Sequence, residues 1–583
     1  MSHVKKAHSG QTLLRNASLV DVKEKTIRKS DILIRNGVFA PIDGLRAGAK
    51  VIDLTGRYLC PGLIDSHTHS ELSLMSVAPF AEMLTAFGTT AAIIDCHDFV
   101  NVVGMRGLRL LIRESSGTSL RAYFTAPACV PSRRGFEDSG ALIAAKDIEA
   151  ALCLKRVIGL AEVMDTERVL ARDAELLKAI RLAKAKGMVI DGHCPSMRSD
   201  DEKRYFALSG AKTDHESTNL VELLRKWRMG KWIHLRHTSL GREYSYKEIF
   251  KATGGVRIML ATDGCLSPVD VMSDGHISSF IRALMSDGVR PVDAIAAATI
   301  VPAECYGLAS EIGSISIGNR ADFLILSSLD RFVVDDVFIG GVRVIGDGFE
   351  RMRFPSYAVN TIKARVPEKD DLVLRPPNGH GRAKTVRVNV IGLVKGSLLT
   401  RHIVMPMKIS SGVVASDIKR DVIKVAVLGR FSPEERPQLG FVKGFGLLSG
   451  AFGGSIGQDC QHISVIGTND ADMIKVMETV VENQGGLFYA KDGIIVAGIG
   501  LPIGGIMTDA PAQVVAARIR AMEDALRVNG VGLKSPYLAL SLMITLAAIP
   551  ELKLTNRGLL NVRSGRFMDV MVDCNMKKRK DVA

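Results

Sequence analysis

Short β-branched segments alternate with helical stretches through the middle of this 583-residue chain, and this rhythm constrains the fold more than any other feature. Eight candidate strands lie between roughly residues 59 and 264: CPGLIDSH, TTAAIIDCH, RAYFTAPA, VIGLAEVMD, GMVIDGH, KTDHE, KWIHLRH and VRIMLATDG. Strands that alternate with helices are typical of parallel sheets, and eight repeats favour a closed (β/α)8 barrel over an open doubly wound sheet. We therefore predict an α/β fold with a TIM-like barrel over residues 59–310.

The segments that flank this region have a different character. Residues 1–58 contain short strands divided by turn signals, and similar sequence returns in residues 311–358. The two parts predict one small β domain that is split in the sequence and built from both ends. Residues 359–583 mix strands and helices without a clear repeat, which predicts a C-terminal α+β domain.

Charge and cysteine usage narrow the partners and the compartment. The net charge is +14, but basic residues are spread along the chain, and the one dense run, KKRK at 577–580, lies in a polar tail. We therefore expect no nucleic-acid partner. None of the nine cysteines form a CxxC pair, and no apolar run reaches the ~18 residues that span a membrane. These features predict a cytoplasmic protein without a membrane partner.

The segment PGLIDSHTHSE, residues 61–71, contains the first candidate metal ligands. Alternate side chains of a strand share one face, so His67 and His69 point the same way, ~6.6–6.8 Å apart along the chain. One divalent ion can join such a pair. An HxH pattern is also common by chance, so the pair alone does not establish a metal site.

Further ligand-type residues follow the later strands of the predicted barrel, where catalytic groups of such barrels collect. Taken singly, each has an ordinary interpretation, such as a core histidine, a surface carboxylate or a helix N-cap. Their recurrence at strand after strand favours a site of nitrogen and oxygen ligands for Zn, Mn or Fe. These residues are Asp95, His97, Glu162, His193, His215 and Asp263.

Motifs of several other enzyme classes are missing. The chain has no GxSxG nucleophile elbow, no HExxH, and no GxGxxG or GxxxxGK[ST] phosphate loop. HCPS at 193–196 lacks the second cysteine of the compact zinc-deaminase signature.

Several of these segments resemble, in the same order, those of the adenine deaminase family in the amidohydrolase superfamily. PGLIDSHTHSE resembles the first-strand motif of the superfamily. The more specific segments are FGTTAAIIDCHDFVNVVG, GLAEVMD, DGHCP, HES and ATDG, and then GFVKGFGL, VIGTNDADM, LPIGGIMTD and IPELKLT. The resemblance covers nearly the whole chain.

The resemblance implies a binuclear divalent metal site, with Mn, Fe or Zn. Its ligands would be His67, His69, His193, His215 and Asp263, with Glu162 as the bridging carboxylate. Asp263 would also carry a proton to the departing ammonia, and Glu71 and His97 would assist catalysis. The implied reaction is hydrolysis of adenine, a small purine base, to hypoxanthine and ammonia in purine salvage, by an enzyme expected to be a homo-oligomer.

The chain departs from the family pattern at several positions. Leu72 follows the HxH motif, His237 follows the seventh strand, and Gly264 replaces a second acid after Asp263. A segment that usually carries two histidines reads GQDCQH at 457–462. Two alternatives therefore stay open: hydrolysis of another purine, cyclic amide or amidine, or a non-catalytic relative, against which the intact ligand set speaks.

Overall fold

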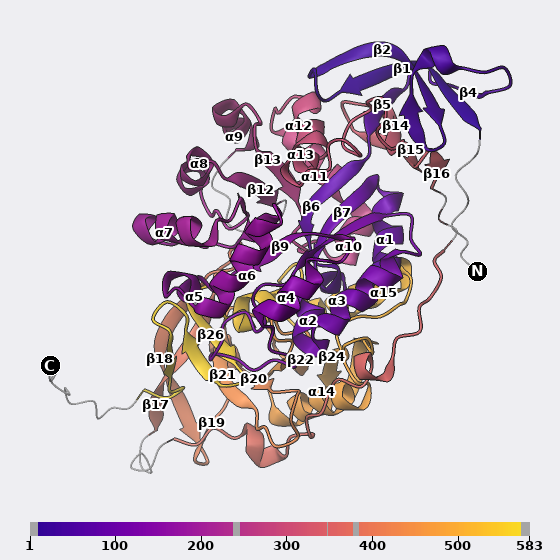
Figure 1. Cartoon of the computed structure of the whole chain (residues 1–583). Coiled ribbons are helices and arrows are strands. Elements are labelled where there is room, and N and C mark those ends of the chain that lie inside the picture. The colour runs from indigo at the N-terminus through magenta and orange to yellow at the C-terminus, as the bar shows by residue number, and fades with distance from the viewer. Residues whose placement is uncertain (1–9, 237–244, 345, 347, 377–383, 573–583) are drawn as a thin grey trace.

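The computed structural model describes residues 10–236, 245–344, 346, 348–376 and 384–572. Figure 1 shows a sheet assembled from both ends of the first 344 residues at one end of the molecule, a layer of parallel strands and helices in the middle, and the C-terminal region at the other end. The predicted α/β architecture is confirmed.

The central α/β unit contains parallel strands that form two sheets, in the orders β10-β9-β8-β7-β6 and β11-β12-β13. Most of these strands are buried along their whole length, as the continuous apolar runs in the sequence indicate. The strands are β6 (Leu63–Thr68), β7 (Thr89–Asp95), β8 (Arg121–Ala126), β9 (Val157–Val163), β10 (Val189–Gly192), β11 (Thr213–Asp214), β12 (Trp232–Arg236) and β13 (Ile258–Ala261).

Backbone hydrogen bonds join the two sheets at both of their meeting edges. Lys212 N donates to Ile190 O over 2.8 Å, beside β10 and β11. At the other edge, Asp263 N donates to His67 O over 2.9 Å, just beyond β13. The carboxyl ends of the strands therefore lie around one common rim.

Helices connect successive strands and lie outside the two sheets (Figure 1). Helix α6 illustrates how the sequence specifies them: the Asp173 carboxylate caps it by accepting from Leu176 N, and its buried stripe includes Ala179, Ile180 and Ala183. The helices are α1 (Val77–Ala86), α2 (His97–Val103), α3 (Met105–Ser115), α4 (Ala145–Ala151), α5 (Thr166–Leu170), α6 (Ala174–Ala185), α7 (Ser199–Ser209), α8 (Leu220–Arg228), α9 (Tyr246–Thr253), α10 (Pro268–Asp274), α11 (Ile277–Ser286), α12 (Pro291–Ala297) and α13 (Ile300–Cys305).

A separate sheet, called here the split sheet, combines strands from before and after the α/β unit. Its order is β16-β15-β14-β5-β1-β2-β3, with β4 also paired to β1. The joint is the antiparallel pair β5–β14, in which Leu59 opposes Ile325. The strands are β1 (Gln11–Asp21), β2 (Thr26–Arg35), β3 (Val38–Ala40), β4 (Lys50–Asp53), β5 (Tyr58–Pro61), β14 (Phe323–Ser328), β15 (Val333–Ile339) and β16 (Val342–Arg343).

The C-terminal region is built on a mixed sheet in the order β19-β18-β17-β21-β20-β23-β22-β24-β25. These strands are β17 (Thr385–Leu393), β18 (Thr400–Ser410), β19 (Val413–Val414), β20 (Val422–Leu428), β21 (Gln438–Lys443), β22 (Ala451–Gly454), β23 (Ile463–Gly467), β24 (Gly486–Lys491) and β25 (Ile494–Gly500). The remaining elements are α14 (Asp470–Glu482), α15 (Ala512–Val528), α16 (Pro536–Leu538), a π-helix (Ala539–Thr545), β26 (Leu552–Thr555), β27 (Gly558–Asn561) and β28 (Arg566–Met568).

This region packs directly against the α/β unit. Thr508 exchanges backbone hydrogen bonds with Leu74 and Ser76, at 2.9 and 3.0 Å. The Gln458 side chain donates to the Asp98 carboxylate, which lies 360 residues earlier in the chain. In the described part of the chain, no helix combines the length and the hydropathy of a membrane span, and the described cysteines form no disulfide.

Candidate metal centre

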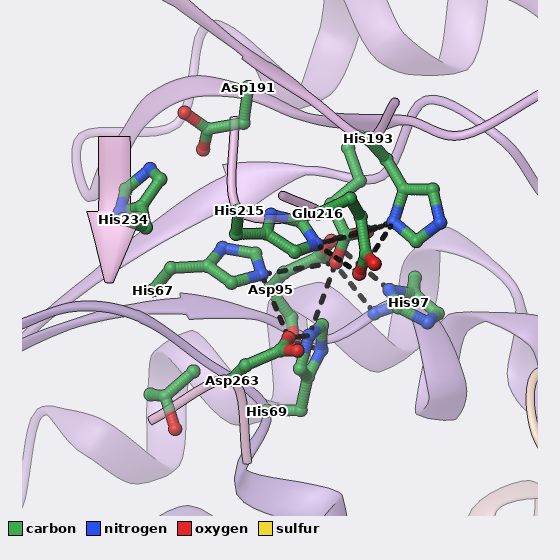
Figure 2. A network of polar contacts seen from close by, with 12 residues as sticks. His67, His69, Asp95, His97, Asp191, His193, His215, Glu216, His234 and Asp263 are labelled. Carbon is green, nitrogen blue, oxygen red and sulfur yellow. Dashed lines mark hydrogen bonds and ion pairs between the residues drawn. The ribbon is translucent and has the colours of Figure 1, made fainter. Parts of the chain in front are cut away.

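His67 and His69 meet two carboxylates at the rim of the α/β unit (Figure 2). His67 Nε2 lies 3.1 Å from Glu162 Oε1 and 3.4 Å from Asp263 Oδ1. His69 Nε2 lies 3.2 Å from each of the same two oxygen atoms. Two imidazoles therefore converge on one pair of oxygens, as their alternation along β6 predicts.

A second group forms around the other oxygen of the Glu162 carboxylate. His193 Nδ1 lies 2.7 Å from Glu162 Oε2, and His215 Nε2 lies 3.4 Å from the same atom. The two imidazole nitrogens are 3.2 Å apart. Glu162 thus stands between two pairs of imidazole nitrogens and presents one oxygen to each pair.

The ionisable groups of this cluster are buried, and burial shifts their pKa values. The exposed fraction of each residue is 8% or less. Burial raises the pKa of Glu162, but His215 and His193 outweigh it and hold that pKa well below its usual range. Burial likewise raises the pKa of Asp263, and the charges of His215 and Arg236 hold it well below its usual range. Both carboxylates are therefore ionised at neutral pH.

The donor set fits divalent cations. Ligand atoms at ~2.0–2.2 Å from a tetrahedral metal ion lie about 3.4 Å from one another, and most of the N–O separations around Glu162 are 3.1–3.4 Å. The cluster is a buried site for a divalent metal.

Neighbouring residues orient the imidazoles. His69 Nδ1 lies 3.0 Å from the backbone oxygen of Asp95, which fixes the ring so that Nε2 faces the cluster. The Lys226 ammonium group of α8 is fully buried and donates to Cys194 O and Asp214 Oδ1, both at 2.7 Å. Since these acceptors directly follow His193 and precede His215, Lys226 holds the ends of β10 and β11 together.

Arg236 and Glu216 also lie at the site, although neither is among the site residues predicted from the sequence. Arg236 Nη1 donates to Glu216 Oε1 over 2.9 Å and to Asp263 Oδ2 over 2.6 Å. Asp263 therefore presents Oδ1 to the two histidines while Oδ2 is held by the guanidinium group. A signal was present, because Glu216 directly follows His215 in the HES segment.

His97 and Glu71, the predicted assisting residues, occupy different places. His97 packs edge-on against His69, with ring centroids 4.8 Å apart, and its side chain lines the cavity beside the metal centre. Glu71 accepts hydrogen bonds from Phe99 N and from Ser70 Oγ, at 3.2 and 3.0 Å. Glu71 is not among the described residues that line this cavity.

Part of the lining of this cavity comes from the C-terminal region. Gln458 and Asp459 contribute polar groups there, and four apolar side chains complete the wall: Leu398, Leu542, Leu546 and Ala548. The GQDCQH segment stands out in the sequence only as a departure from the family pattern, since nothing local indicates that a segment hundreds of residues away reaches this rim. The contact between the two regions is a property of the folded chain.

Two departures from the family pattern are in mutual contact. Gly264 has φ +63°, and a Cβ atom built there would lie 2.9 Å from both Leu72 Cδ1 and the backbone oxygen of His69. A larger residue at 264 is therefore incompatible with this position of Leu72. His237, the third altered residue, lies outside the described residues.

A parallel α/β fold with a buried histidine–carboxylate metal site at the rim of its strands defines a metal-dependent hydrolase, and residues 58–344 match the Amidohydrolase family. Residues 397–566 match the Adenine deaminase C-terminal domain. An adenine deaminase from Moorella thermoacetica is 33% identical, with 96% of this chain and 95% of that protein covered. Relatives of the same name from Archaeoglobus fulgidus and Kosmotoga olearia are 35% and 34% identical over 96% of this chain, with 95% and 96% of their own lengths covered. The chain belongs to the adenine deaminase family.

Proposed function

We propose that this protein hydrolyses adenine to hypoxanthine and ammonia, a reaction of purine salvage. The observation that carries the proposal is the arrangement of four histidines around the Glu162 carboxylate, in a chain that matches adenine deaminases over nearly its full length. The substrate is a small purine base, and the bond that is cleaved joins a ring carbon to an exocyclic nitrogen.

We infer a binuclear centre of Mn, Fe or Zn. His67, His69 and Asp263 would hold one cation, His193 and His215 the other, and Glu162 would bridge them. Two adjacent cations repel each other, and an anionic bridge offsets this repulsion. When bound, the cations supply the Lewis acidity that activates a water molecule near neutral pH.

The protein's own groups move the protons. Asp263 would accept a proton from the attacking water and deliver it to the departing ammonia. Arg236 donates to the Oδ2 atom of Asp263 and fixes the carboxylate, so that Oδ1 faces His67 and His69. The apolar wall from the C-terminal region excludes bulk water, which strengthens these electrostatic interactions. His97 contributes to the same cavity, whereas Glu71 acts on the reaction only through its neighbours.

The remaining features of the proposal concern the assembly of the chain. We propose that the two parallel sheets close into one (β/α)8 barrel, supported by the hydrogen bonds at both meeting edges. The division into residues 1–58 with 311–358, 59–310 and 359–583, the homo-oligomeric state and the cytoplasmic location stay predictions.

Ammonia release over a purine panel tests the reaction. The protein is loaded separately with Mn, Fe and Zn, and its metal content is measured before the assay. We expect turnover of adenine to exceed that of guanine, cytosine and adenosine. Turnover of another amide or amidine without turnover of adenine would replace the proposed substrate and leave the hydrolase class in place.

A further inference from the structure

The segment between β22 and β23 carries Asp459 into the cavity beside the metal centre. Gln458 anchors it by donating to both Asp98 oxygens, at 2.7 and 2.8 Å, and its backbone N donates to Ser541 Oγ over 3.1 Å. The buried Arg430 guanidinium group holds the far side of the segment by donating to Gln461 O over 3.0 Å. The position of Asp459 is therefore fixed before any ligand binds.

Asp459 combines burial with an unused acceptor. Only 2% of the residue is exposed, and its Oδ2 atom has no hydrogen-bond partner among the described residues. Its Oδ1 atom lies 3.5 Å from His97 Nε2, which also has no hydrogen-bond partner there. An unpartnered buried carboxylate oxygen is costly, so its presence in a cavity indicates a donor supplied by a ligand.

The described charged side chains around the cavity leave the Oδ2 atom of Asp459 without a hydrogen-bond donor. Among the described residues that line the cavity, Arg236 pairs with Glu216 and Asp263, and His97 Nε2 faces Oδ1, the other oxygen of Asp459. A free purine base carries one ring N–H on its imidazole ring, next to ring nitrogens that accept hydrogen bonds. A nucleoside substituted at N9 lacks that N–H. A carboxylate facing the ring therefore distinguishes a free base from its nucleoside.

We propose that Asp459 accepts a hydrogen bond from the imidazole N–H of the purine substrate and thereby selects the free base over N9-substituted purines. This inference rests on the proposed adenine substrate and assigns the selection to the C-terminal region. Asp459 is a specificity-determining residue that contacts the side of the substrate away from the reacting carbon.

The test compares adenine with 9-methyladenine in the wild type and in Asp459→Ala, both metal-loaded. For the wild type we expect kcat/KM to be at least ~10²-fold lower for 9-methyladenine, because a site built to bind an N–H rejects the analogue that lacks it. In Asp459→Ala, kcat/KM for adenine should fall ~10- to 100-fold, mostly through KM. The value for 9-methyladenine should change less than about 3-fold.

Glu137→Gln is the matched control, because Glu137 is a buried carboxyl group near Asp459 that is not among the described residues lining the cavity. Burial raises the pKa of Glu137 to about 8, so an amide replaces a largely neutral group of the same shape. Its preference for adenine over 9-methyladenine should equal that of the wild type. Asp459→Asn, which keeps the shape of the side chain, provides a second variant if the alanine variant folds poorly.

The outcomes separate this inference from the proposed function. A preference for adenine that survives in the metal-replete Asp459 variants overturns the role of Asp459 while adenine deamination stands. An equal loss of preference in Glu137→Gln also overturns it, since the effect would then be general. A wild-type enzyme that does not deaminate adenine removes both proposals.

Discussion

Glu162 is the residue on which the proposed binuclear centre depends most. Its two oxygens face different histidine pairs, so one carboxylate sets the spacing of both ligand groups. Its pKa is held well below the usual range in spite of burial, which means that the surrounding positive charge exceeds the cost of desolvation. The negative charge of the Glu162 side chain is therefore as important for the site as the shape of that side chain.

Glu162→Gln should lose paired metal occupancy while the fold is retained. A neutral amide has the same shape but cannot offset two adjacent cations, so metal analysis should give clearly less than two ions per chain. Glu149→Gln, a change on an exposed helix position, is the control and should keep wild-type metal content. Full occupancy of both positions in Glu162→Gln would exclude the bridging role.

Asp263→Asn should lower kcat by ~10²-fold or more, the usual scale for a positioned acid–base group. KM should change less, because the loss falls on the transition state. Asp263 is also a proposed ligand, so the comparison is made at measured and equal metal content. The exposed Asp330 provides a control through Asp330→Asn. A kcat within a few-fold of the wild type would show that another group carries the proton.

At the scale of secondary-structure elements, the site is assembled from the ends of strands and held by the helix that follows β11. Lys226 of α8 contacts the segments after β10 and at the end of β11, and Glu222 Oε1 lies 3.1 Å from its ammonium group. Burial alone would lower the pKa of Lys226, but Asp214 and Glu222 raise it above its usual value. The lysine is charged and stabilises two buried carboxylates.

Lys226→Met should destabilise the protein by about 3–5 kcal/mol, the usual cost of leaving buried charges without their partner. It should also weaken metal binding, because His193 and His215 are the chain neighbours of Cys194 and Asp214, the two residues that accept hydrogen bonds from Lys226. Thermal unfolding and a metal titration measure the two effects, and the exposed Lys251→Met serves as control. A variant with wild-type metal affinity would limit Lys226 to a role in stability.

Much of the α/β unit could be predicted because its elements follow local rules, and the strand ends where the proposed ligands lie could be predicted in the same way. Apolar runs, turns and strand ends can be recognised from about ten consecutive residues. Four of the proposed ligands lie at or near the carboxyl ends of strands: His67, Glu162, His193 and Asp263. Contacts between residues that are far apart in the chain leave no signal in the local sequence. The approach of Asp459 to His97, and the ion pair of Arg236 with Asp263, depend on how elements pack.

At the scale of the whole molecule, the C-terminal region forms one wall of the cavity, and a buried lysine supports that wall. Lys553 of β26 donates to Met543 O over 2.7 Å, to Leu398 O over 3.2 Å and to Leu542 O over 3.4 Å. Leu398 and Leu542 both line the cavity. Among the described residues, no carboxylate forms an ion pair with this ammonium group, and burial lowers the pKa of Lys553 to about 7.

Stability should therefore depend on pH through Lys553. Between pH 7 and its ordinary pKa of 10.5, the unfolded chain binds one more proton at this residue than the folded chain does. The free energy of unfolding of the wild type should rise by up to about 1.4 kcal/mol per pH unit across that window relative to Lys553→Met. Parallel unfolding curves at pH 7 and pH 9 measure the difference. A constant difference would mean that the residue stays charged.

The split sheet has a consequence for the order in which the nascent chain can fold. Strands β1 to β5 leave the ribosome first, but the partner of β5 on its other side, β14, is synthesised about 260 residues later. During that interval β5 presents an unpaired edge, which is a site for erroneous pairing. The sheet is completed only after the whole α/β unit has been made, so translation stalled before residue 323 should yield chains that are prone to aggregate.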